Sequence, residues 1–365
     1  MQKRSPNIRF GLFFVQNKEN FCIYAKKVVL LCTFYACDYM TPTNERQSNA
    51  ELLRIICILA ILLHHFCVHA LYPEIDSLDI IGTGWEKHFI LFNYAFIYLG
   101  VNCFILISGW FGIKPSWRGF LNLYLICIFY NLLASYNNFF SQETLVQVFL
   151  PFTHGKLWFI KCYFKLFLIA PLLNPAIQYL NKRYYAFLIV LIGAASLYYD
   201  TLWVSGYSLP HFLYLYLIGG FLRRFVSEER MNAHRWYYFG AYVAFGLAWG
   251  ACTVATVHGH AIPYWQVWNY NNPVLMLTAV AFFLFMMSWK FQSRIINRLA
   301  MSTLAVYMLN EAVVKYDFLT PYAHAFNAWA QIAIWIGVTV AFYILAVGID
   351  QIRIFITQPI LKRIK

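Results

Sequence analysis

A row of polar side chains follows the first long apolar segment, from Glu51 and Arg54 to His65 and His69. At 100° and about 1.5 Å per residue of α-helix, Arg54 and His65 fall within roughly 20° of each other and about 16 Å apart along the axis. Glu51 and His69 fall on the same side. If this segment spans a bilayer, the arginine lies at one interface and the histidine near the midplane, both directed inward. Ionisable groups in such positions are candidates for a functional site.

Other interpretations of this row exist. In a purely structural interpretation, Arg54 anchors the helix at the lipid headgroups. His65 then donates a hydrogen bond to a neighbouring carbonyl, because a buried imidazole needs a partner. A metal site at His65 and His69, four residues apart, is a third interpretation. No clear third ligand accompanies them, so the sequence predicts no metal.

A second polar group follows the apolar segment that ends at Ser108 and Gly109, where Lys114 and Arg118 come next. In a purely structural interpretation, Ser108 and Gly109 let two helices approach closely, and Lys114 and Arg118 only set the membrane topology. If Lys114 and Arg118 share a membrane face with Arg54, however, the three cations form a mouth suited to a polyanionic ligand such as a phosphate.

A third group, Trp158, Lys161 and Lys165, opens a later apolar segment. A structural interpretation places Trp158 in the aromatic belt at the membrane interface and lets the lysine side chains snorkel to the membrane surface. It is the better interpretation for Lys165. Functionally, Trp158 and Lys161 would form an outer vestibule.

The fourth group is Asn310 and Glu311, about twelve helical residues from Arg298. That distance is roughly 18 Å, so Asn310 is predicted level with His65, where either side chain could orient the imidazole or contact a substrate. Alternatively, Asn310 bonds between helices.

The elements that carry these groups are membrane helices. The chain has 365 residues, of which 61% are hydrophobic and 12% charged, and runs of roughly twenty apolar residues recur, as spanning helices require. We predict an all-α, polytopic bundle of about ten spans near 52–70, 89–112, 119–140, 157–179, 184–203, 208–226, 236–258, 273–290, 298–318 and 328–350.

The loops sort by charge. Every second loop carries basic residues, namely Arg46, Lys114, Arg118, Lys182, Arg183, Arg223, Arg224, Arg230, Arg235, Lys290, Arg294, Arg298, Arg353, Lys362, Arg363 and Lys365. The alternate loops hold little beyond Lys87, Lys156 and Lys315. By the positive-inside rule, the loops rich in basic residues are cytoplasmic. Both termini then lie in the cytoplasm, so the number of spans must be even. Orientation and anionic lipid explain the net charge of +13 better than nucleic acid does.

The first thirty-nine residues do not fit this pattern, because their apolar stretches at 10–15 and 28–37 are too short to span. We expect residues 1–39 to be a non-native or disordered extension, with Met40 rather than Met1 as the natural start, and residues 40–365 to form the transmembrane domain.

With the groups in this order on ten spans, the chain resembles the integral membrane acyltransferase 3 family of bacterial polysaccharide O-acyltransferases. The resemblance runs from about Arg46 to the C-terminus. It rests on the Arg-x10-His spacing of Arg54 and His65, the Phe-x-x-x-Ser-Gly of Phe104–Gly109, Leu157–Phe159 with Ala170–Asn174, and the Ser-Thr-Leu-Ala-Val-Tyr-Met-Leu of 302–309. The chain departs from many members in having Lys114 and Arg118 for an Arg-x-x-Arg pair, and Asn310 for a histidine.

The resemblance implies a multi-pass enzyme of the bacterial inner membrane that moves an acyl group, most often acetyl, from cytoplasmic acyl-CoA to a hydroxyl of a cell-surface or lipid-linked glycan. It makes His65 the essential histidine, with Arg54 as its partner. His65 could act as a general base or carry the acyl group briefly, and we favour the base. Ser108, Lys114 and Arg118 would bind the donor; no bound cofactor is implied.

The competing hypothesis is a transporter or flippase for a glycan or an anionic lipid-linked substrate. Proton-coupled transporters usually carry intramembrane carboxylates, and here Glu311 is the one plausible buried carboxylate. A flippase would need larger outer loops than 71–88 and 140–156.

Overall fold

The computed structural model describes residues 46–136, 141–198, 200–262, 266–322 and 325–363. These residues form helices and turns, with no β-strand among them, which confirms the predicted all-α class. The proposed extension 1–39 and the alternative start at Met40 lie outside the described residues.

The α-helices are, in chain order, α2 (Ser48–Phe66), α3 (Pro73–Ser77), α4 (Trp85–Phe92), α5 (Ala95–Tyr98), α6 (Gly100–Phe111), α7 (Trp117–Ala134), α8 (Gln142–Phe149), α9 (Trp158–Tyr179), α10 (Lys182–Tyr198), α11 (Asp200–Trp203), α12 (Leu209–Phe225), α13 (Glu228–Ala233), α14 (Arg235–Val257), α15 (Pro273–Met287), α16 (Arg294–Ala300), α17 (Thr303–Met308) and α18 (Ala328–Lys362). Two π-helical turns follow α2 and α17 directly, η1 (Cys67–Leu71) and η3 (Leu309–Val313), and short 3₁₀ turns form η2 (Val204–Gly206), η4 (Tyr316–Phe318) and η5 (Thr320–Tyr322).

Several described helices are long and apolar enough to cross a membrane. Five pass this test, namely α2 with η1, α7, α9, α14 and α18, and the pair Trp85–Phe92 and Ala95–Phe111, bent by 46°, counts as a sixth. The chain is therefore a helical membrane protein. The count of ten spans and the cytoplasmic location of both termini stay predictions.

The ninth predicted span, 298–318, is not one helix. It is divided into α16, α17 and η3, with Ser302 at φ −90° and ψ 1° between the first two. The hydroxyl of Thr303 donates to the carbonyl oxygen of Ala300 at 2.6 Å, and such side-chain bonds compete with the helical ladder. The expectation of a continuous helix here was wrong.

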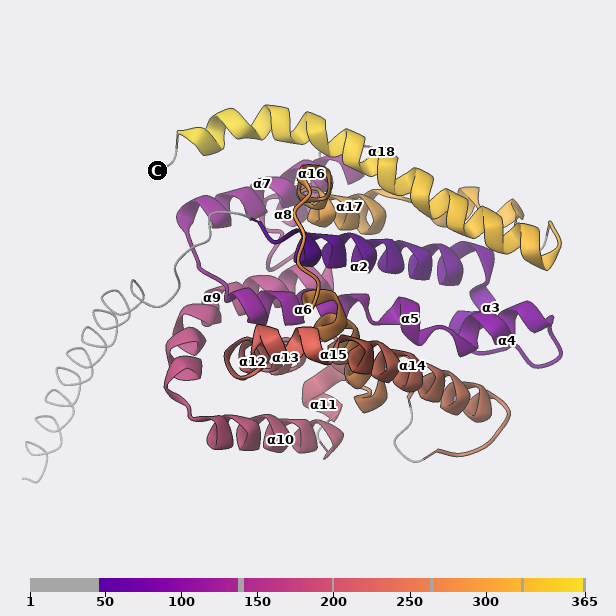
Figure 1. Cartoon of the computed structure of the whole chain (residues 1–365). Coiled ribbons are helices and arrows are strands. Elements are labelled where there is room, and N and C mark those ends of the chain that lie inside the picture. The colour runs from indigo at the N-terminus through magenta and orange to yellow at the C-terminus, as the bar shows by residue number, and fades with distance from the viewer. Residues whose placement is uncertain (1–45, 137–140, 199, 263–265, 323–324, 364–365) are drawn as a thin grey trace, which may run out of the picture.

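Helix α2 lies at the centre of the bundle. It packs against α18 on one side and α6 on the other, with α12 and then α10 beyond α6 (Figure 1). In the apolar part of α2, 61% of residues are buried, against 22% in α7, α14 and α18. Glu51 and His65 of the polar row are therefore buried within the protein, as intramembrane charges usually are.

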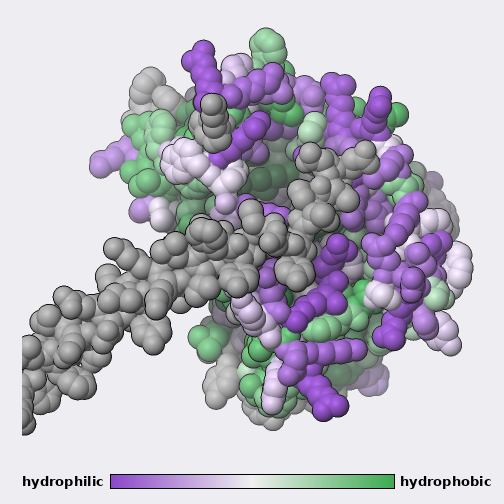
Figure 2. Space-filling model, turned by 60° about the vertical axis from the view of Figure 1, so that its left-hand side comes forward, coloured by the Kyte–Doolittle hydropathy of each residue, from purple (hydrophilic) through white to green (hydrophobic). Residues whose placement is uncertain are grey.

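One end of the bundle collects the loops with basic residues. The hydroxyl of Ser48, at the start of α2, donates to the Asn297 side chain at 2.8 Å, which brings α16 and its exposed Arg294 and Arg298 to this end. The end of α18 lies there too (Figure 1). Figure 2 shows hydrophilic side chains gathered over this end, as the positive-inside interpretation expects of a loop face.

Glycines set the closest helix contacts. A Cβ on Gly109 of α6 would overlap the backbone of Tyr216 in α12, and one on Gly219 would overlap the carbonyl of Leu106. Small residues at such positions let membrane helices approach closely. The packing interpretation of Gly109 therefore fits the structure.

Within α14, two glycines give a matched stability test. A Cβ on Gly250 would overlap the carbonyl oxygen of Phe92, whereas one on Gly240 meets nothing within 4 Å. We expect Gly250→Ala to destabilise the fold by about 1–3 kcal/mol, because backbone must shift to admit the methyl group. Gly240→Ala should be neutral or stabilising by up to roughly 1 kcal/mol. Thermal unfolding in detergent compares them, and equal stabilities would contradict the close contact of α14 with α4.

Candidate active site

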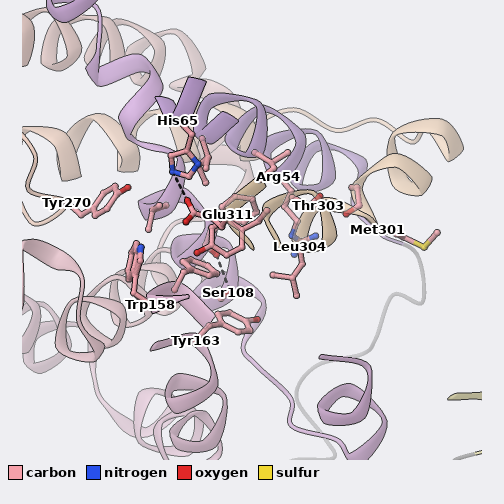
Figure 3. A pocket seen from close by; sticks show the side chains of 17 residues that line it. Arg54, His65, Ser108, Trp158, Tyr163, Tyr270, Met301, Thr303, Leu304 and Glu311 are labelled. Carbon is pink, nitrogen blue, oxygen red and sulfur yellow. Dashed lines mark hydrogen bonds and ion pairs between the residues drawn. The ribbon is translucent and has the colours of Figure 1, made fainter. Parts of the chain in front are cut away.

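His65 lies near the C-terminal end of α2 and is held by two neighbouring side chains of η3. Its Nδ1 is hydrogen-bonded to Oδ1 of Asn310, and its Nε2 lies 2.9 Å from Oε1 of Glu311 (Figure 3). Only 9% of His65 is exposed, and Asn310 is fully buried. Sequence reasoning placed Asn310 level with His65, and the structure brings both η3 residues into contact with the imidazole.

These partners determine which nitrogen can exchange a proton. A neutral imidazole has one N–H, and Nδ1–H donates to Asn310 in this arrangement. Nε2 then faces Oε1 of Glu311 at 2.9 Å with its lone pair free, so a proton taken up at Nε2 is shared with the carboxylate. Because the bond at Nδ1 fixes the tautomer and the ring orientation, Nε2 is the reactive position.

Arg54 lies eleven residues earlier on the same continuous helix, about 16 Å away along its axis. Its guanidinium donates to Oε1 of the buried Glu51 at 2.6 Å, and Arg46 approaches the same oxygen at 3.8 Å. The Arg54 side chain keeps 29% of its surface exposed and lies 5.9 Å from the Phe111 ring centroid. Of Arg46, Glu51 and Arg54, only Arg54 lines the cavities described below.

A cavity of about 230 Å³ joins the two ends of this row. Arg54, His65, Ser108, Trp158 and Glu311 all line it (Figure 3). It contains imidazole, carboxylate and guanidinium groups on one wall and aromatic rings on the other. Such an enclosed, largely apolar space with a few convergent polar groups is typical of a small-molecule site.

A second cavity of about 350 Å³ adjoins the first. The two share Arg54, Ser108, Tyr163 and Leu304, and Lys114 lines the second one. The Ser108 hydroxyl donates to the Phe104 carbonyl at 3.0 Å, so this side chain borders both spaces with its donor already used. The pair of cavities thus forms a path from Lys114 past Arg54 to His65.

The remaining predicted site residues lie outside both linings. Arg118 is exposed, Lys161 is half-buried, and Glu51 contacts the site through Arg54. His69 is exposed on η1, with its ring centroid 5.6 Å from that of His65 and 5.0 Å from that of Tyr316. Over the described residues, no group of three His, Cys, Asp or Glu side chains could hold a metal ion.

Sequence reasoning named Trp158 of this aromatic wall but missed its tyrosines. Tyr270 lines the first cavity and stacks on Tyr98 with ring centroids 4.4 Å apart, and Trp158 lies 4.6 Å from Tyr207. Tyr98 also shares a hydrogen bond of 3.0 Å with Tyr207. Because the chain contains 27 tyrosines, the sequence does not indicate which of them line the site.

His64 was also passed over, although it is adjacent to His65. Its Nδ1 is hydrogen-bonded to the Tyr94 hydroxyl at 2.6 Å, and it does not line the first cavity. Its hydrogen bond therefore joins α2 to the turn between α4 and α5.

The fold and site define a membrane-embedded enzyme class with a histidine-centred cavity between helices. A family model described as an acyltransferase domain matches residues 48–350, which include every residue of this cavity. The chain belongs to the acyltransferase 3 family and is a membrane acyltransferase. Searches of curated proteins and of solved structures give no significant match.

Proposed function

We propose that this protein is an O-acyltransferase of the bacterial inner membrane, which moves an acetyl group from cytoplasmic acetyl-CoA to a hydroxyl of a cell-surface or lipid-linked glycan. The observation that carries the proposal is the single cavity in which Arg54 and the partnered His65 both lie. It provides an anion-binding group and a proton acceptor at the two ends of one path.

His65 acts as the general base in this proposal. Its Nε2, together with Glu311, accepts the proton of the sugar hydroxyl while that oxygen attacks the thioester carbon. The new C–O bond forms, the C–S bond breaks, and the proton passes to the departing thiolate, so CoA leaves as the thiol. The thioester is already activated, so an acyl-imidazole intermediate is not required, although Nε2 is placed to form one.

Arg54 and Lys114 bind the phosphates of the donor. Both are cations bordering the second cavity, and guanidinium groups bind phosphate through paired hydrogen bonds. The pantetheine arm then extends past Ser108 toward His65, along the roughly 16 Å of helix axis between Arg54 and His65. Arg118 is exposed beside this mouth and would act only through its charge.

The acceptor enters from the opposite end, where Trp158 lines the first cavity and Lys161 lies one turn further along α9. An aromatic face suits a sugar ring, and a lysine suits its polar substituents. No nucleic acid partner is proposed, and the basic loops act on membrane lipid.

Purified protein incubated with radiolabelled acetyl-CoA and glycans extracted from the source cell envelope tests the proposal. We expect release of CoA and labelled glycan. Absence of CoA release together with absence of labelled glycan or labelled enzyme would contradict acyl transfer, and flux of unmodified glycan into vesicles would favour the transporter hypothesis instead.

Glu311→Gln gives a more specific test of the proton acceptor. The amide keeps the size of the carboxylate and a hydrogen bond to His65, but it cannot accept the transferred proton. We expect kcat to fall by roughly 10²-fold with little change in the KM for acetyl-CoA. The matched control is Glu86→Gln, a carboxylate of α4 that lies outside both cavity linings, and a similar loss in both variants would contradict the assignment.

A further inference from the structure

Tyr307 lies in α17, one helical turn before Glu311, and lines the first cavity. Only 8% of the residue is exposed, and its ring lies 5.4 Å from that of Phe159. Its hydroxyl has no hydrogen-bond partner among the described residues. A buried hydroxyl that borders the cavity therefore has no hydrogen-bond partner in the part of the chain that the structure describes.

This arrangement has a cost that a simple packing role does not explain. Leaving a buried donor unpaired is unfavourable, whereas phenylalanine would fill the same space without that penalty. Two other hydroxyls of the lining are already used, since Ser108 donates to Phe104 and Thr303 donates to Ala300. The Tyr307 O–H thus remains to donate to a molecule in the cavity.

The proposed reaction supplies an acceptor for this hydrogen bond. When the sugar oxygen attacks, the carbonyl oxygen of the thioester gains negative charge, and a fixed O–H group in a dry site stabilises such an oxyanion. His65 and Glu311 accept a proton, so they do not serve this purpose. Tyr307 and Glu311 line the same cavity, and Glu311 contacts Nε2 of His65, so the Tyr307 side chain borders the space in which the thioester carbon would lie.

We propose that Tyr307 is a catalytic residue that donates its phenolic hydrogen bond to the carbonyl oxygen of the acyl-CoA thioester. This proposal rests on the proposed function. It assigns His65 and Tyr307 opposite tasks, the first taking the proton of the acceptor and the second stabilising the charge that develops on the donor.

The chain provides a matched control in Tyr343 of α18. Its hydroxyl is also without a partner among the described residues, and 6% of the residue is exposed, but it does not line either cavity. Phenylalanine at either position should leave the protein equally or more stable to heat. A purely structural role predicts the same behaviour for both variants.

The test compares wild type, Tyr307→Phe and Tyr343→Phe with acetyl-CoA and the envelope glycans. We expect kcat to fall by roughly 10²-fold in Tyr307→Phe alone, with the KM for acetyl-CoA within about threefold of wild type. Infrared spectra of bound acetyl-CoA carrying a ¹³C-labelled carbonyl should show the carbonyl band at lower frequency in wild type and Tyr343→Phe than in Tyr307→Phe.

Wild-type turnover by Tyr307→Phe, or a carbonyl band unchanged by the substitution, would overturn the inference while leaving the proposed function intact. A rate loss with an unchanged band would instead assign the hydroxyl to the acceptor sugar. A wild-type protein that neither binds nor turns over acetyl-CoA would refute the proposed function itself, and with it the donor assigned to Tyr307.

Discussion

Replacing His65 with alanine is expected to lower the rate of acyl transfer by roughly 10²- to 10⁴-fold, the usual contribution of a well-placed general base. The methyl group cannot accept a proton at the position of Nε2, and Glu311 is left without the imidazole that it contacts. The loss should appear in kcat with acetyl-CoA and envelope glycans, while the variant still inserts and elutes as folded protein.

His69→Ala is the matched control for this variant. Its ring lies 5.6 Å from that of His65, but the side chain is exposed and outside the cavity linings. We expect its rate to stay within a few-fold of wild type. Retention of activity by His65→Ala would refute the proposed mechanism. Rapid acid quenching of the wild type tells a base from an acyl carrier, because only the carrier accumulates labelled protein.

Arg54→Gln should raise the KM for acetyl-CoA by roughly 10- to 100-fold, the cost of losing a charge-assisted contact with a phosphate. The change in kcat should be smaller, since Arg54 lies about 16 Å along the helix axis from the reacting histidine. Steady-state kinetics at several salt concentrations provide the measurement. The salt dependence of KM should weaken in the variant, because one cation no longer contributes.

A higher KM in Arg54→Gln has two possible causes, which are loss of a phosphate contact and a structural change around Glu51. Removing Arg54 leaves the buried Glu51 with the more distant Arg46, at 3.8 Å, as an ion-pair partner, and an undercompensated buried charge is destabilising. In the double variant Glu51→Gln with Arg54→Gln that charge is gone. KM should remain high if Arg54 binds the donor, and recovery would show that Glu51 caused the defect. Arg46→Gln, which lines neither cavity, should change KM less than threefold.

The sequence was most informative where a helix is straight and continuous. Arg54 and His65 belong to the same α-helix, so their common face and separation followed from 3.6-residue periodicity alone. The prediction that Asn310 lies at the depth of His65 assumed a continuous ninth span, and that span is divided into shorter helices. Asn310 still meets His65, because η3 brings two adjacent side chains to one ring.

Contacts between distant segments were not accessible in this way. Tyr270 and Tyr98 stack across 172 positions of sequence, and nothing in local periodicity pairs them. The unpaired state of the Tyr307 hydroxyl is likewise a property of its surroundings, since it depends on every atom within hydrogen-bonding reach. Of the basic residues predicted to bind the donor, Lys114 lines a cavity and Arg118 does not. The two residues are four positions apart, and charge alone gave no reason to choose between them.

The enclosure of α2 by the other helices has a consequence for the choice of acyl group. In the proposed mechanism, Arg54 and His65 lie on one continuous helix, so a donor whose phosphates bind Arg54 would present its thioester carbon at the same depth whatever acyl group it carries. A longer acyl chain cannot be accommodated by moving the phosphates back. Its extra carbons must extend beyond the histidine, where Trp158 and Tyr270 limit the space. Chain-length selectivity would therefore be determined at the end of the cavity farthest from the CoA headgroup, and enlarging that end would admit longer donors without altering the nucleotide contacts.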